Sequence, residues 1–175
     1  PSGLAAAYYL ELMGHHAVIF EAKSKLGGML RYGIPSYRFP RERLDQDIEA
    51  ILSTGVEVHL NTKIGSGEGE VPFNKLREEY DAVYIAIGAH EDKKVGIEGE
   101  DSKGVISAVE MLGSIGEEVM PDFKDKTVVV IGGGNVAMDC TRSAIRLGAK
   151  KVTIAYRRRK SDMTALPEEI EGAVA

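Results

Sequence analysis

Apolar and polar positions alternate along the first half of the chain in the pattern of an α/β protein. The expected elements are a helix over Ser2–Met13, a strand over Ala17–Phe20, a helix over Arg41–Thr54 and a strand over Val56–Leu60. A glycine follows each helix, at Gly14 and Gly55. Residues 26–40 contain too many glycines and prolines for a regular element, so we expect a loop there.

The second half repeats this alternation and ends in a complete strand–helix–strand pattern. The expected elements are a buried strand over Asp81–Ile87, a helix over Ser107–Ile115, a strand over Thr127–Ile131, a helix over Asn135–Leu147, a strand over Lys151–Tyr156 and a helix from Pro167. A charged, glycine-rich connector lies between residues 90 and 103. The elements alternate as in a protein built on parallel sheets.

Glycine turns open two of the predicted helices. The run Val128–Ile131 leads into a G-x-G-x-x-A turn formed by Gly132, Gly134 and Ala137. Such a turn presents backbone N–H groups at a helix start, where they bind the pyrophosphate of a dinucleotide. Pro1-Ser2-Gly3-Leu4 has the sequence expected of the tail of a second such turn. Two dinucleotide sites indicate electron transfer between two cofactors.

The two turns differ in the charge that follows the next strand. Glu21 ends the strand after the first turn, and a carboxylate there accepts hydrogen bonds from ribose hydroxyls, which suits FAD or NAD. The second strand ends in Arg157, Arg158, Arg159 and Lys160. Guanidinium groups bind phosphate oxygens, so this end suits the 2′-phosphate of NADPH, although a solvated basic loop is the alternative.

Composition excludes several classes of protein. The 175 residues carry a net charge of −5, which argues against a nucleic-acid partner, and no apolar run is long enough to span a membrane. Cys140 is the single cysteine, so these residues hold no disulfide, no C-x-x-C pair and no cysteine-bound iron–sulfur cluster. The four histidines lack metal-ligand spacing, and we expect no metal site. One cysteine fits a reducing compartment, and we expect a cytoplasmic protein.

The chain resembles the small (beta) subunit of NADPH-dependent glutamate synthase and related flavin reductases. The most specific match is Leu26-Gly27-Gly28-Met29-Leu30-Arg31-Tyr32-Gly33-Ile34-Pro35-Ser36-Tyr37-Arg38-Phe39-Pro40, a loop that the family places against the flavin. Phe20-Glu21-Ala22 is similar to the family's ribose-binding strand end, and Ala86-Ile87-Gly88 to its turn near the FAD pyrophosphate.

The resemblance and the turns together imply one set of cofactor-binding residues. For FAD they are Ser2, Gly3, Glu21, Ala22, Gly27, Gly28, Leu30, Arg38, Val58, Ile87 and Gly88; for NADPH they are Gly132, Gly134, Asn135, Val136, Ala137, Arg157 and Arg158. Arg38 would either meet a cofactor phosphate or close its loop through a salt bridge. We assign no catalytic residue, because the redox chemistry belongs to the cofactors.

The implied fold is α/β with two Rossmann-like dinucleotide-binding units, one for FAD and one, inserted, for NAD(P)H, both incomplete in this chain. Residues 1–105 would form part of the FAD-binding domain, 106–125 a connector and 126–175 the start of the NAD(P)H-binding domain. The resemblance implies that NADPH reduces FAD, which passes electrons to an iron–sulfur partner such as the glutamate synthase large subunit.

Other functions stay open at this point. Modules similar to dihydropyrimidine dehydrogenase or ferredoxin:NADP reductase would share both turns, and a non-catalytic nucleotide-binding module is a further alternative.

Overall fold

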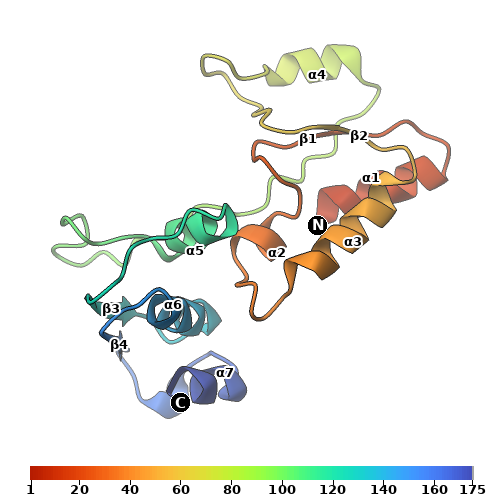
Figure 1. Cartoon of the computed structure of the whole chain (residues 1–175). Helices are drawn as coiled ribbons and strands as arrows, with labels where there is room; N and C mark the ends of the chain where they lie inside the picture. Colours follow the sequence, from red (N-terminus) through yellow and green to blue (C-terminus); the bar gives the residue numbers. More distant parts are fainter. Residues whose placement is uncertain (175) are drawn as a thin grey trace. The chain divides into compact units, whose positions relative to one another are not determined.

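The computed structural model describes residues 1–174, and the chain folds into two compact units. The first contains residues 1–31 and 36–89, and the second contains residues 32–35 and the chain from His90 onward. Figure 1 shows both units coloured along the sequence. Whether the cofactor domains divide at residues 105 and 125 stays a prediction.

Unit 1 is built on two short parallel strands packed on two helices. Its elements are α1 (Ser2–Leu12), β1 (Val18–Phe20), α3 (Arg41–Leu52), β2 (Glu57–His59) and α4 (Phe73–Glu79). Strands β1 and β2 pair in parallel, with Ile19 opposite Val58. Helices α1 and α3 lie side by side (Figure 1). The apolar spacing of α3 directs Leu44 and Ile48 into a core with Leu4 and Leu26.

Two of the expected elements were wrong. A short helix, α2 (Met29–Tyr32), forms inside the segment expected to be a loop. Residues 81–87 form no strand, and Tyr84, Ile85 and Ile87 are exposed. An apolar run becomes a buried strand only when neighbouring strands take up its backbone hydrogen bonds, and within residues 1–174 no strand pairs with it.

Unit 2 contains the complete strand–helix–strand motif. Its elements are α5 (Ala108–Gly116), β3 (Thr127–Ile131), α6 (Asn135–Arg146), β4 (Lys151–Ala155), the short 3₁₀ helix η1 (Lys160–Asp162) and α7 (Pro167–Val174). Strands β3 and β4 are parallel, as the crossover through α6 requires. Ser107 caps α5 through its Oγ, which accepts from the N–H groups of Val109 at 3.1 Å and Glu110 at 3.2 Å.

Helix α6 organises the core of unit 2. Cys140 and Ala144 pack against Met111 and Leu112 of α5. The other face of the β3–β4 pair is open: Val129 is 60% and Ile131 57% exposed. In the part of the chain that the structure describes, α6 covers only one side of the two strands, so only that side of β3 faces the core.

Helix α7 packs on α6 and fixes the end of the described chain. Met138 is fully buried against Ala165 and Ile170. Arg142 of α6 forms an ion pair with Glu169 of α7, with 2.7 Å between Nη1 and Oε2. Among residues 1–174, no helix has the length and apolarity to cross a membrane.

Candidate functional site

Gly132 makes the tight turn between β3 and α6 that the sequence predicted. Its φ angle is +146°, which residues with a side chain rarely adopt, and its N–H donates to the carbonyl oxygen of Ala155 at 3.0 Å. A Cβ placed on Gly132 would lie 3.3 Å from the Cβ of Ala137. The small side chain of Ala137 therefore lets the helix start close to the strand.

The start of α6 offers its backbone N–H groups to an anion. Gly134 is the N-cap, and no side chain caps the helix. The first N–H groups of a helix have no acceptor within the helix, and the helix dipole adds partial positive charge there. An uncapped helix after a glycine turn thus fits a dinucleotide pyrophosphate. Val136 is 51% exposed in this first turn, whereas Cys140 and Ala144 of the same helix are buried.

The chain after β4 returns to the glycine turn and binds it at two points. The N–H of Ala165 donates to the Gly133 carbonyl oxygen at 3.0 Å. The N–H of Leu166 donates to Oδ1 of Asn135 at 2.9 Å. Asn135, expected among the cofactor ligands, thus also joins α6 to the start of α7. The spacing of residues carries no signal for this contact, since the two partners lie on different elements.

Tyr156 packs directly against the glycine turn. A Cβ on Gly133 would lie 2.7 Å from two atoms of the Tyr156 ring. The ring therefore occupies the space that any side chain at position 133 would need. The phenol O–H donates to the backbone carbonyl oxygen of Asp162 at 3.0 Å, which also ties Tyr156 to η1. The sequence carries no signal for the packing of Tyr156 on Gly133 or for its hydrogen bond to Asp162.

Arg157 and Arg158 follow β4 on the surface. Both are exposed, and in residues 1–174 neither guanidinium group takes part in a hydrogen bond or ion pair with the protein. Guanidinium groups without protein partners are available to phosphate oxygens. Their position just after β4 is the one at which the sequence predicted a 2′-phosphate contact.

The expected flavin residues around the start of α1 lie close together. A Cβ on Gly3 would be 3.2 Å from the Cβ of Ala86, and a Cβ on Gly28, whose φ is +55°, would be 3.0 Å from Cδ of Pro1. The first turn of α1, which includes Ser2, therefore meets both the Gly27–Gly28 turn and the chain before Ile87 and Gly88. Glycine at positions 3 and 28 allows this approach.

Glu21, Ala22 and Val58 lie at the β1–β2 pair. The N–H of Glu21 donates to the His59 carbonyl oxygen at 2.9 Å, which extends the pairing by one residue past β1. Its carboxylate Oε1 accepts from the N–H of Lys23 at 2.8 Å. The Val58 side chain packs into the core of unit 1.

Two arginines hold the segment that follows Leu26. The buried Arg31 donates from Nε to the Leu26 carbonyl oxygen at 2.6 Å and pairs with Asp45 of α3. Arg41 donates to the carbonyl oxygens of Leu30 at 2.8 Å and Arg31 at 2.6 Å. Burial lowers the pKa of Arg41, and the nearby charge of Arg31 lowers it further. These contacts shape the Gly27–Gly28 turn, and the sequence carries no signal for them because the partners lie on different segments.

Leu30 and Arg38 have contacts of their own in this segment. Leu30 packs against the Leu4–Leu26–Leu44–Ile48 core. Arg38 is half-buried and already interacts within the chain, and both expectations for it, cofactor phosphate and loop closure, stay predictions.

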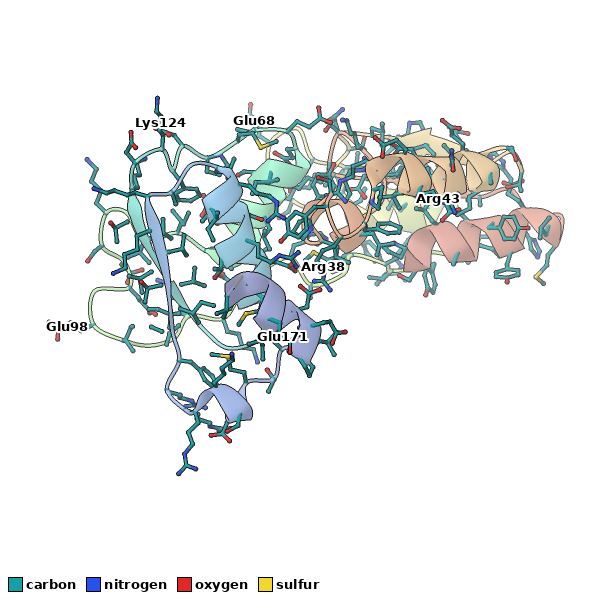
Figure 2. The ribbon with its side chains drawn as sticks, turned by 60° about the horizontal axis from the view of Figure 1, so that its bottom comes forward. Arg38, Arg43, Glu68, Glu98, Lys124 and Glu171 are labelled. Atoms are coloured by element: carbon teal, nitrogen blue, oxygen red, sulfur yellow. The ribbon has the colours of Figure 1, made fainter. Side chains whose placement is uncertain are left out.

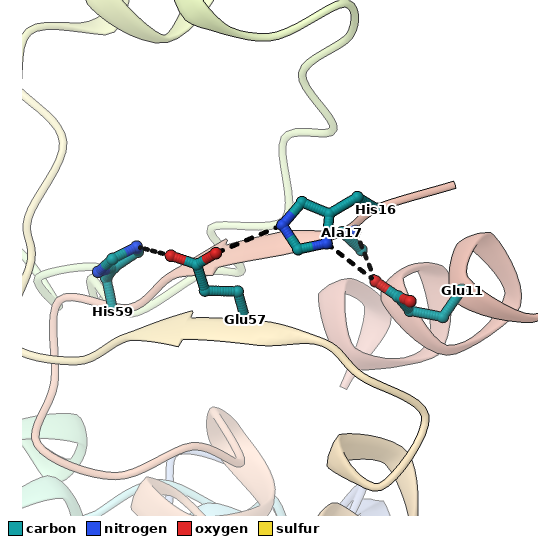
Figure 3. A network of polar contacts seen from close by, with 5 residues as sticks. All are labelled: Glu11, His16, Ala17, Glu57 and His59. Carbon is teal, nitrogen blue, oxygen red and sulfur yellow. Dashed lines mark hydrogen bonds and ion pairs between the residues drawn. The ribbon is translucent and has the colours of Figure 1, made fainter. Parts of the chain in front are cut away.

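Two histidines of unit 1, His16 and His59, interact with carboxylates. Figure 3 shows Glu57 between them, with Oε2 at 3.3 Å from Nε2 of His16 and Oε1 at 2.8 Å from Nε2 of His59. Glu11 lies 3.8 Å from Nδ1 of His16 and accepts from the N–H of Ala17 at 2.7 Å. In the described residues, no three His, Cys, Asp or Glu side chains are placed to hold a metal ion.

Cys140 is a core residue. Its side chain is buried between α5 and α6. Burial, with the charge of Asp139 adding to it, raises the pKa of the thiol to about 12. A thiol with so high a pKa is a poor nucleophile.

Comparison with known proteins decides the family. The model of the pyridine nucleotide-disulphide oxidoreductase family matches residues 1–175. The chain belongs to this family. The α/β dinucleotide-binding fold is thereby confirmed, and the glutamate synthase resemblance is supported by curated relatives. The family's name refers to disulfides, yet this chain carries one cysteine, and it is buried.

Curated relatives match over essentially the whole chain. It is 46% identical to the beta subunit of NADP(+)-dependent formate dehydrogenase from Moorella thermoacetica, covering 100% of this chain and 25% of that protein. It is 43% identical to the beta subunit of NADPH-Fe(3+) oxidoreductase from Geobacter sulfurreducens, covering 99% and 26%. For the glutamate synthase [NADPH] small chain from Escherichia coli the identity is 36%, covering 99% and 38%.

A solved structure shares the fold. FprA from Mycobacterium tuberculosis in complex with NADPH is 25% identical, with a TM-score of 0.79, covering 98% of this chain and 44% of that one. The chain thus spans between 25% and 44% of the length of these relatives.

Proposed function

We propose that this chain is part of an NADPH-dependent, FAD-containing oxidoreductase that feeds electrons to an iron–sulfur partner. The observation that carries the proposal is the opposite charge at the two ribose ends. Glu21 follows the strand after the first turn, whereas Arg157 and Arg158 follow the strand after the second. A carboxylate accepts from ribose hydroxyls and repels a 2′-phosphate, while the two guanidinium groups bind one.

The residues of unit 2 bind and orient NADPH in this proposal. Gly132 and Gly134 let the pyrophosphate approach the backbone, and the N–H groups at the start of α6 donate to it. Arg157 and Arg158 hold the 2′-phosphate. NADPH supplies a hydride and FAD accepts it, so the protein contributes placement and electrostatics.

The residues of unit 1 bind FAD in this proposal. The α1 N-terminus, with Ser2 and Gly3, faces the pyrophosphate, and Glu21 with Ala22 meets the adenosine ribose. Gly27, Gly28 and Leu30 would form the flavin-facing segment. The buried Arg31 and the half-buried Arg41 keep this segment folded against α3, which supports a preformed cofactor wall.

The names of the relatives support a partner protein and leave its identity open. Two are beta subunits and one is a small chain, which supports assembly with other subunits. The identity to the formate dehydrogenase subunit exceeds that to the glutamate synthase small chain. We therefore keep the glutamate synthase large subunit as one candidate acceptor among several iron–sulfur proteins, in a cytoplasmic enzyme.

The test measures bound flavin and nucleotide preference in the full-length protein. We expect yellow protein that oxidises NADPH faster than NADH with ferricyanide as acceptor. Changing both arginines, Arg157→Glu with Arg158→Glu, should weaken the binding of NADPH at least tenfold and the binding of NADH less than about twofold, because only NADPH carries the 2′-phosphate.

The control for that double variant carries the same change of charge. Arg43 and Arg77 are exposed arginines of α3 and α4, and changing both to Glu should leave the preference intact. Equal losses for NADPH and NADH in the test variant would refute the 2′-phosphate assignment. Colourless protein that still binds NADPH would refute the oxidoreductase and favour the non-catalytic module.

A further inference from the structure

We propose that Asp162 is a positioning residue that sets the preference for NADPH by holding the Arg157–Arg158 loop in its binding conformation. This inference rests on the proposed function, since it concerns the same 2′-phosphate. Asp162 lies on η1, beyond the basic run, and does not belong to the expected cofactor ligands.

Asp162 closes the basic loop through three hydrogen bonds. Its Oδ2 accepts from the N–H of Arg159 at 3.2 Å, and its own N–H donates to the Arg159 carbonyl oxygen at 3.0 Å. Its carbonyl oxygen accepts from the Tyr156 O–H at 3.0 Å. The two residues that flank Arg157 and Arg158 are therefore both bonded to Asp162.

Tyr156 connects this closed loop to the glycine turn. Its ring lies against Gly133, so the loop is fixed relative to the start of α6. The start of α6 would bind the pyrophosphate and the loop would bind the 2′-phosphate of the same nucleotide. Asp162 thereby controls the spacing between two phosphate contacts without touching either one.

A loop that is already ordered before binding should hold the 2′-phosphate of NADPH more tightly. Arg157 and Arg158 are exposed, and ordering long side chains and a loop on binding costs entropy. A loop already closed by hydrogen bonds loses less freedom when the phosphate binds. The gain applies to NADPH and not to NADH, because NADH has no 2′-phosphate for the loop to hold.

The negative charge of Asp162 has the opposite effect. A carboxylate beside a basic loop weakens the attraction of that loop for a phosphate. Removing the charge alone should therefore leave phosphate binding equal or tighter. Removing the acceptor oxygen breaks the one bond of the three that the side chain makes, from the Arg159 N–H to Oδ2, and should loosen the loop, while the two bonds of the Asp162 backbone remain. Two substitutions separate the effect of the charge from the effect of the acceptor oxygen. Asp162→Asn removes the charge and retains an acceptor oxygen, whereas Asp162→Ala removes both.

The experiment uses the full-length protein and two probes of the adenosine end, adenosine 2′,5′-bisphosphate and AMP. For Asp162→Ala we expect bisphosphate binding to weaken roughly five- to tenfold and AMP binding to change less than about twofold. The KM for NADPH should rise similarly with kcat nearly unchanged, since the loop only binds. Asp162→Asn should restore wild-type affinity or exceed it.

A charge-matched control and a stability measurement accompany these variants. Asp101 is an exposed carboxylate in the charged segment of residues 90–103, where it pairs with Lys94. Asp101→Ala should not alter the preference for the bisphosphate over AMP. Thermal melts should show both Asp162 variants folded. Tighter bisphosphate binding in both variants would mean that Asp162 acts only through its charge, and would overturn the positioning role, as would an unchanged affinity in Asp162→Ala.

The same data separate this inference from the proposed function. Wild-type protein that does not prefer the bisphosphate over AMP contradicts the NADPH assignment itself. Wild-type protein that prefers the bisphosphate, with a preference that Asp162→Ala leaves intact, contradicts only the role of Asp162. Should Asp162→Ala melt below the assay temperature, the comparison of Asp162→Asn with wild type decides: a loss of preference there contradicts positioning, and its retention supports it.

Discussion

Oδ1 of Asn135 accepts a hydrogen bond from the N–H of Leu166 at 2.9 Å, which ties the first residue of α6 to the chain just before α7. This bond holds the glycine turn at Asn135, in addition to the contact of the Tyr156 ring with Gly133. It gives Asn135 a structural role beside the proposed cofactor contact, and the two roles respond differently to substitution.

Asn135→Asp should separate these two roles. The carboxylate keeps an acceptor for Leu166, so the melting temperature should stay within a few degrees of wild type. Its negative charge lies where we propose the pyrophosphate, and we expect NADPH binding to weaken about tenfold or more. Asn135→Ala is the matched variant, and it should cost about 1 kcal/mol of unfolding free energy. Fluorescence titration and urea unfolding measure both quantities.

Gly133→Ala should lower the stability of the fold, whereas Gly134→Ala should lower the affinity for NADPH. A Cβ at position 133 would meet the Tyr156 ring at 2.7 Å, so overpacking should cost about 1–3 kcal/mol of stability. A Cβ at position 134 would meet only Oγ1 of Thr164 at 3.5 Å, an ordinary contact. We expect Gly134→Ala to fold normally and to bind NADPH weakly, because its methyl group would obstruct the phosphate. Unchanged binding in folded Gly134→Ala would contradict the turn assignment.

Arg31→Ala should destabilise unit 1 more than Asp45→Ala. Arg31 is buried and also donates to the Leu26 carbonyl oxygen, whereas the Asp45 side chain is 50% exposed. We expect a loss of about 3 kcal/mol for Arg31→Ala and about 1 kcal/mol for Asp45→Ala. Urea unfolding checks the order of the two values. Equal losses would show that the ion pair alone, without the bond to Leu26, accounts for the stabilisation.

Cys140 should resist alkylation while the protein is folded. Its pKa is raised to about 12 from 9.0, so at pH 8 only about one thiol in 10⁴ is ionised, against roughly one in ten in the unfolded chain. Iodoacetamide should label Cys140 only after denaturant is added, as mass spectrometry would show. Rapid labelling of folded protein at pH 8 would contradict its buried position.

The same raised pKa makes a pH-dependent contribution to stability. The fold favours the neutral thiol, so this contribution is fully present below pH 9.0 and is lost as the pH rises towards about 12. Urea unfolding of wild type and Cys140→Ala should therefore show a steeper loss of stability for wild type above pH 9.

Exposed charged side chains away from the proposed sites provide neutral control substitutions for the stability measurements. Figure 2 shows Glu98 projecting outward from the charged segment of residues 90–103, and Lys124 extends from the loop before β3. Both are exposed, so changes there should shift the unfolding free energy by less than about 0.5 kcal/mol. They serve as baseline variants for the stability measurements above.

Local patterns determined most helices and the paired strands of this chain. The apolar spacing of α3 and of α6, the glycine after each helix and the strand–turn–helix order around Gly132 depend on neighbours within a few residues. Such signals are physical properties of a short segment, and α1, β1, β2, α5, β3, β4 and α7 were predicted within one or two residues at most ends. The opposite charges after β1 and β4 could also be located from the sequence.

Contacts between distant segments were decided only by the tertiary structure. Residues 81–87 have the composition of a buried strand, yet they lack a strand to pair with among the described residues and are exposed. The bond of Asn135 to Leu166, the Tyr156 ring against Gly133 and the pair of Arg31 with Asp45 each join elements whose approach depends on the whole packing. The sequence thus determined the turns and the charge beside them, whereas tertiary packing determined how those turns are held, because a strand or loop is stabilised by partners that its own residues do not specify.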